Sequence, residues 1–320
     1  MSNAKNQFKQ SWKVRQEARY NHWTLDRPVN QIQLAFRNHW QVFKGLIGNL
    51  NGRCLEVGCG RGSISSYFAD NGFECHLFDY GFDILTIGKE IFKRNQHKGF
   101  PVCGDALNLP YKDGSFDVVV SIGLLEHFDD VSYQVAFNRI TALTSSSTPQ
   151  RTQQYASVVS SLPPCSTSER NLVSGIIAEQ IRVLGKGGVF LGYVVPDMPF
   201  NVQRYFRWVN KILNIIFILK GDRENKPIKP DIYRNNYMPS VYLDIIKSYN
   251  IDAKSIGMYP LPMISHSPQF PFSLLPPKME IVLTQIFTMI LWIKGIFIKG
   301  HPWTCKEEFG QAFLIYFKKG

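Results

Sequence analysis

The sequence predicts an α/β fold with a doubly wound, mostly parallel sheet, and three observations carry this prediction. Short apolar runs alternate with segments of helical periodicity between residues 53 and 130, which is the order expected of strand, helix and strand units. A glycine-rich turn follows the first of these runs at residues 58–62. Residues 117–122 are almost continuously apolar, as in a central parallel strand that is buried on both faces.

The first strand is expected at residues 53–57, where a short apolar run with Cys and Val lies between Asn51-Gly52 and the glycines. Such a run, bounded by turn residues, is typical of a buried strand. The next helix is expected at residues 63–70, where apolar residues recur at helical spacing. Ser63 is expected to cap the start of this helix.

The glycine run indicates a turn that lies against a flat ligand. Gly58, Gly60 and Gly62 have no Cβ and can adopt positive φ, so the backbone can turn sharply and approach a bound molecule. Their spacing is G-x-G-x-G, with Ser63 at the place of the third glycine of the dinucleotide fingerprint, which argues against a nicotinamide or flavin dinucleotide. The acidic Glu56 just before the run would suit a cationic ligand.

Two carboxylates follow the next two predicted strands. Residues 73–79 alternate into a strand that ends in Asp79, 21 positions after Gly58, where an acid can accept hydrogen bonds from both hydroxyls of a ribose. Residues 100–103 form a third short strand, and Asp105 follows beside a small residue, where an adenine ring and its amino group could lie. Either carboxylate could instead only cap or start a turn.

These segments resemble the class I S-adenosylmethionine-dependent methyltransferases, in particular the branch that methylates small molecules and quinone or lipid precursors. The resemblance rests on four pieces in family order: LEVGCGRG, HLFDYG, GDALNLPYKDGSFDVVVSIGLLEHF and EQIRVLGKGGVFLGYVVP. It implies a seven-stranded Rossmann-like sheet whose last two strands form an antiparallel hairpin. The family usually has Lys-Pro-Gly-Gly where this chain has Gly185-Lys186-Gly187-Gly188, a change in turn stiffness that leaves the turn possible.

The resemblance also implies S-adenosyl-L-methionine as the cofactor and assigns residues to it. Glu56 and the glycine turn would surround the methionine part, Asp79 the ribose, and Asp105 the adenine. Ser121, at the end of the fourth strand, would line the cofactor pocket, or would be a satisfied core hydroxyl. The full set of expected cofactor contacts is Glu56, Gly58, Cys59, Gly60, Gly62, Asp79, Tyr80, Asp105, Ala106 and Ser121.

The chemistry implied is an in-line displacement of a methyl group from a sulfonium, and no catalytic residue is assigned to it from the sequence. Positioning alone can lower such a barrier by roughly 7 to 11 kcal/mol. Glu126 and His127 follow the fourth strand, at the edge where open α/β sheets bind ligands, so either could deprotonate an acceptor hydroxyl. Glu126 could equally pair locally while His127 packs under the cofactor. No metal is expected, because no further ligand cluster lies nearby.

Size and composition favour one decorated domain in the cytoplasm. The chain has 320 residues and 44% hydrophobic residues, so it can bury a sizeable core and is not wholly disordered. Its six cysteines contain no C-x-x-C pair, and the basic N-terminus lacks an apolar signal segment, so free thiols in a reducing compartment are expected.

The net charge of +11 is concentrated in the last third of the chain, where residues 200–320 hold 16 basic and 8 acidic side chains. Nucleic acid is not the expected partner, because Gly123 and its neighbours replace the Pro-Pro-aromatic signature of amino-directed DNA methylases. Residues 203–220 predict a helix with a basic stripe on an otherwise apolar surface, which suits peripheral membrane contact. Residues 281–298 are a second apolar stretch that barely reaches bilayer length. It could be a buried helix, an interfacial anchor or a span.

The chain is thus expected to contain three parts of one domain. Residues 1–50 would form an N-terminal helical lid or ordinary packing against the sheet, and residues 51–199 the cofactor-binding core. Within the core, residues 144–168 contain 12 Ser or Thr among 25 positions, which predicts a flexible surface insertion. Residues 200–320 would supply substrate-side helices and the last two strands. Further elements are expected at residues 84–94, 172–184, 189–195, 240–249, 251–259 and 311–317.

The function that follows from the resemblance is methyl transfer from S-adenosylmethionine to a small, hydrophobic, lipid-like acceptor. Two alternatives stay open. One is a non-catalytic cofactor-binding or scaffold protein of the same fold. The other is an aminopropyl transferase-like enzyme, which would need acidic residues beyond the fourth strand for a polyamine.

Overall fold

A computed structural model describes residues 31–129, 172–197, 234–258, 301–310 and 312–320, together with single helical positions between residues 282 and 297. The predictions made for residues 1–30, 144–168 and 203–220, and most of those for 281–298, lie outside the described residues.

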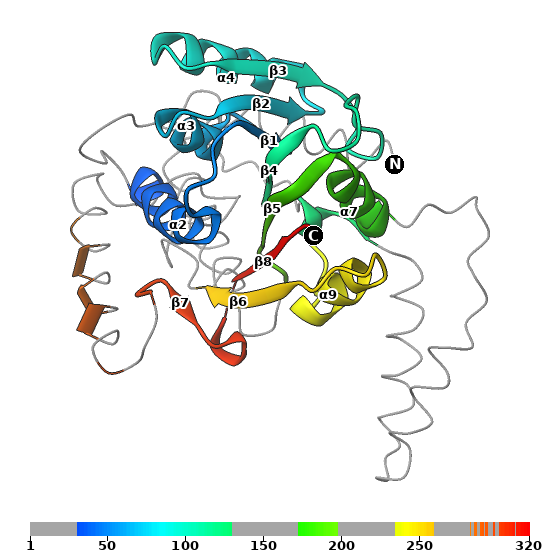
Figure 1. The fold of residues 1–320 in the computed structure, drawn as a ribbon. Helices are drawn as coiled ribbons and strands as arrows, with labels where there is room; N and C mark the ends of the chain where they lie inside the picture. Colours follow the sequence, from blue (N-terminus) through cyan, green and yellow to red (C-terminus); the bar gives the residue numbers. More distant parts are fainter. Residues whose placement is uncertain are drawn as a thin grey trace, which may run out of the picture.

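The described part is organised around one eight-stranded sheet (Figure 1). The first five strands of the chain are parallel, and β8 enters antiparallel between β5 and β6. In spatial order the strands are β3 (Gly99–Cys103), β2 (Glu74–Asp79), β1 (Arg53–Val57), β4 (Phe116–Ile122), β5 (Leu184–Val194), β8 (Ala312–Lys318), β6 (Lys254–Met258) and β7 (Thr304–Cys305).

The strand order reverses between β1 and β4, because the chain winds outward from β1 to β3 and then returns to the other side of β1. In open α/β sheets such a reversal leaves a crevice outside the carboxyl ends of the strands, and ligands bind there. The turns after β1, β2, β3 and β4 all lie at this edge, because parallel strands present their carboxyl ends together.

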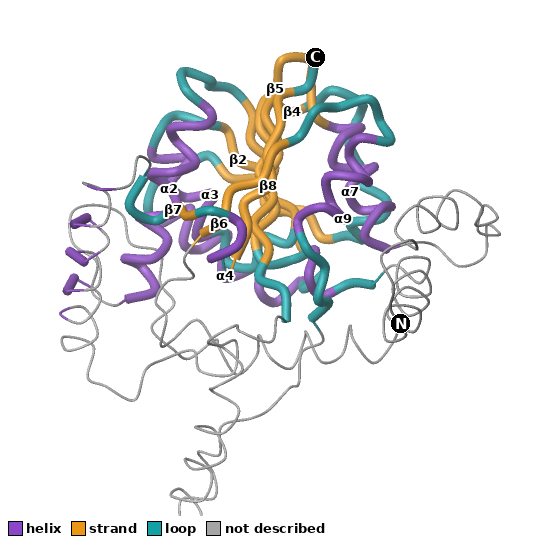
Figure 2. The backbone as a smooth tube through the Cα atoms, turned by 90° about the horizontal axis from the view of Figure 1, so that it is seen from below, coloured by secondary structure: helices purple, strands orange, loops and turns teal. Residues whose placement is uncertain are grey.

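Helices cover both faces of the sheet (Figure 2). One face carries α2 (Gln31–Ile47), α3 (Ser63–Asp70) and α4 (Phe82–Arg94), and the other carries α7 (Leu172–Val183) and α9 (Pro239–Lys247). Each face buries its own hydrophobic cluster, with Trp40 and Phe43 of α2 on the first and Ile176 and Ile246 on the second. Burial on both faces explains why the central strands are almost entirely apolar.

The predicted α/β class and doubly wound sheet are confirmed, and each predicted strand and helix that falls in the described residues has a counterpart within a few positions. β5 begins five residues earlier than expected, and β7 is a two-residue strand that the sequence did not predict. The predicted cap at Ser63 is wrong, because Gly62 occupies the N-cap position with φ 70° and no side-chain cap is formed there.

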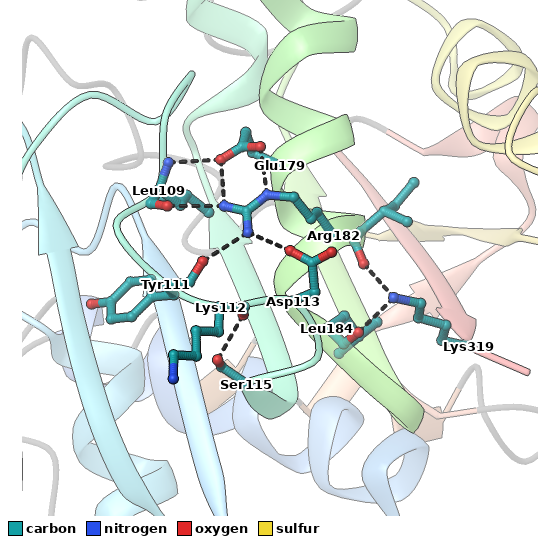
Figure 3. A network of polar contacts seen from close by, with 10 residues as sticks. Leu109, Tyr111, Lys112, Asp113, Ser115, Glu179, Arg182, Leu184 and Lys319 are labelled. Carbon is teal, nitrogen blue, oxygen red and sulfur yellow. Dashed lines mark hydrogen bonds and ion pairs between the residues drawn. The ribbon is translucent and has the colours of Figure 1, made fainter.

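Arg182, near the end of α7, fastens the loop between β3 and β4 to the helix (Figure 3). Its guanidinium donates to both carboxylate oxygens of Glu179, to Asp113, and to the carbonyl oxygens of Leu109 and Tyr111, at 2.7 to 2.9 Å. Glu179 in turn accepts from the Leu109 N–H at 2.8 Å. Asp105 lies in this loop, just after β3. The network therefore stabilises a loop that starts at the carboxyl edge of the sheet.

We expect Arg182→Ala to lower the free energy of unfolding by about 2 to 3 kcal/mol, because charge-assisted hydrogen bonds to partly buried carbonyl groups are lost. Arg182→Lys should recover only part of this, since an ammonium cannot reproduce the planar fork. Urea unfolding followed by circular dichroism measures both. Arg94→Ala, on the exposed end of α4, is the matched control and should change stability by less than about 0.5 kcal/mol. Equal effects at both positions would contradict the structural role of Arg182.

Candidate functional site

The glycine turn after β1 is held in a left-handed backbone conformation. Gly58, Gly60 and Gly62 have φ values of 74°, 53° and 70°, which side chains with a Cβ adopt only with strain. A Cβ on Gly58 would also lie 2.8 Å from the Leu124 side chain, and one on Gly62 would lie 2.8 Å from Leu77. Gly58 and Gly62 are therefore required by the close packing of the turn against the segment after β4 and against β2.

Asp79, at the end of β2, ties this turn to the neighbouring strand end. One carboxylate oxygen accepts the Gly60 N–H and the other accepts the Gly81 N–H, each at 2.8 Å. Burial raises the pKa of Asp79, and the backbone hydrogen bonds from Gly81, Gly60 and Tyr80 oppose this shift. A carboxylate has about four acceptor sites, so these backbone bonds leave acceptor capacity for a ribose hydroxyl.

Glu56 lies in β1 just before the turn and is buried, with 4% of its surface exposed. One carboxylate oxygen, Oε2, accepts the Ser65 N–H at 3.0 Å and the Ser65 hydroxyl at 2.5 Å. Ser65 is the third residue of α3, so Glu56 supplies from another element the cap that Ser63 does not provide. Burial raises the pKa of Glu56 to about 7, against the lowering effect of the bonds from Ser65.

Asp105 lies beside Asp79 at the same edge of the sheet. Asp79 pairs with Cys103 in the register of β2 and β3, and the Gly104 N–H donates to the Asp79 carbonyl at 3.1 Å. The exposed Asp105 carboxylate accepts the Leu107 N–H at 3.0 Å, so it does form the local turn that the sequence left as an alternative. Ala106 follows it and packs against the second hydrophobic cluster.

The remaining predicted cofactor residues fall at the same edge in different environments. Ser121 is buried at the end of β4, and its hydroxyl has no hydrogen-bond partner among the described residues. Tyr80 is exposed beyond Asp79. Cys59 is buried within the turn, and burial raises the pKa of its thiol well above the ordinary value, as expected of a small apolar filler rather than a reactive group.

Glu126 and His127 lie in a short 3-10 helix, η1 (Leu125–His127), after β4. The structure separates them: Glu126 is 1% exposed, whereas His127 is half-buried. The Glu126 Oε1 atom accepts the Val195 N–H at 3.3 Å, so this acid reaches the end of β5. Burial raises the pKa of Glu126, and the nearby positive charge of Arg234 lowers it.

Two residues near Glu126 were not identified from the sequence. Tyr193, near the end of β5, is buried against the ring of His39 from α2, with 4.7 Å between ring centroids. Asn235 is buried between η1 and α9, and its backbone N–H donates to the Glu126 carbonyl at 2.7 Å. A tyrosine in an apolar strand and an asparagine in a loop carry no local signal, because their partners lie far away along the chain.

The family model described as a methyltransferase domain matches residues 55–144. Norajmaline N-methyltransferase of Rauvolfia serpentina is 38% identical over 80 residues, which cover 24% of this chain and 27% of that protein. Demethylmenaquinone methyltransferase of Renibacterium salmoninarum is 38% identical over 73 residues, covering 22% and 29%. The aligned segment thus spans about a quarter to a third of these curated relatives.

Among solved structures, a putative sarcosine dimethylglycine methyltransferase from Galdieria sulphuraria superposes with a TM-score of 0.49 at 11% identity, covering 99% of this chain and 98% of that chain.

A doubly wound sheet with a glycine turn and carboxylates at successive strand ends is typical of nucleotide-binding α/β domains. The family match adds that residues 55–144 are similar to a methyltransferase domain, in agreement with the resemblance to the class I S-adenosylmethionine-dependent methyltransferases. The residues present fit the cofactor that the family uses. The turn has left-handed glycines, the two carboxylates are neighbours, and the unpartnered Ser121 hydroxyl lies at the end of the adjacent central strand.

In the residues that the structure describes, no group of three or more His, Cys, Asp or Glu side chains is arranged to hold a metal ion. No helix in the same ranges combines the length and apolar character needed to cross a membrane.

The raised pKa of Glu56 predicts a pH-dependent stability. Because the folded protein holds this proton up to about pH 7 while the unfolded chain releases it near pH 4.5, the stability contributed by the protonated acid is present at low pH. It is lost as the pH rises from about 4.5 through 7, and the loss is about 3 kcal/mol.

We therefore expect Glu56→Gln, measured by urea unfolding at pH 5 to 8, to become more stable relative to the parent as the pH rises. The raised pKa values of Asp79 and Glu126 also lower stability as the pH rises, and they do so in both proteins. The difference between the two plots of stability against pH therefore isolates Glu56. Parallel curves across this window would show that Glu56 does not titrate there.

Proposed function

We propose that this protein transfers a methyl group from S-adenosylmethionine to a small, hydrophobic acceptor. The observation that carries the proposal is that Asp79 and Asp105 follow neighbouring strands, β2 and β3, beside the left-handed glycine turn, at the edge where the strand order reverses. This arrangement supports an acceptor for a ribose and one for an adenine next to a backbone that a ligand can approach closely. When bound, the sulfonium would supply the electrophilic methyl carbon.

The protein's own contribution would be to bind and orient. Asp79 would hold the ribose, Asp105 and Ala106 would border the adenine, and Gly58 to Gly62 would leave room for the methionine part. Tyr80 and Ser121 would complete the contacts at the ends of β2 and β4. Fixing the reacting atoms in line can supply roughly 7 to 11 kcal/mol of the barrier, so the site does not need a strong general acid.

The carboxyl-terminal residues 200–320 are proposed to form the acceptor side of the same domain. In support, β6 and β8 belong to the same sheet as β1 to β5, and Asn235 bonds to η1. Residues 1–50 are proposed to cover the site, since α2 contacts α3, and His39 contacts Tyr193. The two relatives are named for different acceptors, norajmaline and demethylmenaquinone, so the acceptor of this chain is inferred from its own residues.

Calorimetric titration with S-adenosylmethionine and S-adenosylhomocysteine tests the cofactor. We expect binding of both ligands, and we expect Asp79→Asn to weaken it by about tenfold or more, because two charge-assisted hydrogen bonds to hydroxyls are weakened. Asp83→Asn, in the exposed first turn of α4, is the matched control and should bind like the parent. No heat with either ligand would refute the proposal.

The same titration, combined with a transfer assay using labelled S-adenosylmethionine, separates the alternatives. A scaffold protein of this fold would bind both ligands and yet transfer no labelled methyl group to a lipid-soluble cell extract. An aminopropyl transferase would bind decarboxylated S-adenosylmethionine in preference to the parent compound. Near the end of β4, the positive charge of Arg234 lowers the pKa of Glu126, against the larger raising effect of burial, and Asp129 accepts a bond from the Tyr237 hydroxyl. A positive charge close to Glu126 disfavours a cationic polyamine there.

We also propose peripheral contact with an anionic membrane surface through residues 281–298, with 203–220 as a second basic and apolar segment. The described positions from 282 to 297 are helical, and all of them except Gln285 are apolar. All of them are exposed, including Trp292 at 63% and Phe297 at 81%. Aromatic side chains favour the interface of a bilayer, and the excess of basic residues in this third of the chain favours anionic lipid.

Vesicle flotation tests this contact. We expect the protein to float with phosphatidylglycerol vesicles and less with pure phosphatidylcholine, and Trp292→Ser combined with Phe297→Ser should reduce flotation by about fivefold or more, since exposed apolar area is removed. Tyr249→Ser, an exposed aromatic after α9, is the control and should float like the parent. Unchanged flotation of the double variant would contradict the contact.

A further inference from the structure

The carboxyl ends of β4 and β5 enclose a group of buried polar side chains that cofactor binding does not use. Glu126 is 1% exposed and Tyr193 is 2% exposed. The His39 ring lies edge-on to Tyr193, and Arg234 is close enough for its charge to lower the pKa of Glu126, against the larger raising effect of burial. Charged and phenolic groups are rarely buried together in a core without a partner or a role.

Two oxygen atoms of this group have no hydrogen-bond partner in the part of the chain that the structure describes. One is Glu126 Oε2, whose companion Oε1 accepts the Val195 N–H. The other is the Tyr193 hydroxyl. Leaving a buried polar atom unsatisfied costs about 1 to 3 kcal/mol, and more than nine in ten such atoms are satisfied in folded proteins. Two unsatisfied oxygens at the ligand-binding edge of the sheet therefore point to a bound molecule.

Contacts of Gly123 show that Glu126 and Tyr193 lie close to each other in the fold. The Gly123 N–H donates to the Tyr193 carbonyl at 2.9 Å, and a Cβ on Gly123 would lie 3.7 Å from Glu126 Oε1. The bond from Val195 brings the same carboxylate to the strand that carries Tyr193. After burial, the charge of Glu126 is the largest cause that raises the pKa of Tyr193, as expected of an acid and a phenol within electrostatic reach.

Asn235 fixes the position of Glu126. Its backbone N–H donates to the Glu126 carbonyl, and its amide nitrogen donates to the Leu125 and Phe128 carbonyls at 3.2 and 2.9 Å. Its amide oxygen accepts the Tyr242 hydroxyl at 3.1 Å. With so many bonds from one buried residue, η1 is held rigidly to α9, and the Glu126 carboxylate is pre-organised rather than carried on a free loop.

Resting on the proposed function, we propose that Glu126 and Tyr193 together bind the reacting oxygen of the acceptor, and that this acceptor is a phenol or enol on an apolar ring. The Tyr193 hydroxyl donates to that oxygen, and Glu126 Oε2 accepts its proton. Tyr67 and Trp303 belong to the same buried hydrophobic cluster as Tyr193, and the His39 ring contacts Tyr193, which suits a flat apolar ring.

The acidity of the acceptor hydroxyl is the reason for proposing a phenol or an enol. A buried carboxylate with a raised pKa is a stronger base than an exposed one, and it can take a proton from a phenol or enol, whose pKa is near 10 like that of tyrosine. An aliphatic alcohol is far too weak an acid. The positive charge of Arg234 further favours an acceptor whose oxygen becomes negative as its proton leaves, over an amine that becomes positive.

In the reaction, the acceptor oxygen forms a bond to the methyl carbon while the bond from that carbon to sulfur breaks. The electron pair of the broken bond stays on sulfur, which loses its positive charge. The proton of the acceptor hydroxyl passes to Glu126 and then to solvent. No oxidant, reductant or metal ion is required by this balance.

Fluorescence titration with 1-naphthol, in the presence of saturating S-adenosylhomocysteine, tests the inference without requiring turnover. Naphthalene, which lacks the oxygen, and 1-naphthylamine, which replaces it with nitrogen, are the matched ligands. We expect the parent protein to bind 1-naphthol about tenfold more tightly than either. We expect Glu126→Gln and Tyr193→Phe each to reduce this preference to about threefold or less, because one of the two bonds to the oxygen is lost.

Tyr111→Phe is the control variant, because Tyr111 also has a buried hydroxyl without a hydrogen-bond partner among the described residues but packs among Phe78 and Phe116 on the other face. It should keep the full preference. Tyr193→Phe keeps the ring and decides the test if Glu126→Gln does not fold. Absent or unselective binding of 1-naphthol by the parent, or a preference that survives in Tyr193→Phe, would overturn the inference. Retained calorimetric binding of S-adenosylhomocysteine would leave the proposed function standing.

Discussion

The bond between the Asp79 carboxylate and the Gly60 N–H is the interaction on which the candidate site depends. It joins the end of β2 to the turn between β1 and α3, and the second oxygen of the same carboxylate closes the turn into α4 through Gly81. One side chain thus orients the start of two βα units. The left-handed glycines make this possible, since a residue with a Cβ at Gly58 or Gly62 would collide with Leu124 or Leu77.

Buried acids recur at the carboxyl edge of the sheet with a common arrangement. Glu56 and Glu126 each accept a backbone N–H from a neighbouring element, Ser65 of α3 for the first and Val195 after β5 for the second. In each case burial raises the pKa, because water no longer stabilises the charge. Glu56 also accepts the Ser65 hydroxyl of α3, whereas Glu126 keeps one oxygen without a partner among the described residues.

Much of the framework could be predicted from the sequence, because it depends on local pattern. The apolar runs located β1, β2, β3 and β4, and the glycine spacing located the turn. The cap of α3 could not be found in this way, because Glu56 reaches it from nine residues away. Tyr193 and Asn235 could not be identified for the same reason. The alternation of a strand predicts which face a side chain occupies but not its contacts. Asn235 bonds to Leu125, which lies 110 positions away along the chain.

The insertion of β8 between β5 and β6 has a consequence for how the chain assembles. β5 pairs on its outer side with residues 313–318, more than a hundred positions later. During synthesis, the outer edge of this long, apolar strand has no neighbour until the β8 segment has left the ribosome. Such an edge can recruit strands from other molecules. The nascent chain therefore passes through a prolonged interval in which its central sheet is vulnerable to aggregation and would benefit from a chaperone.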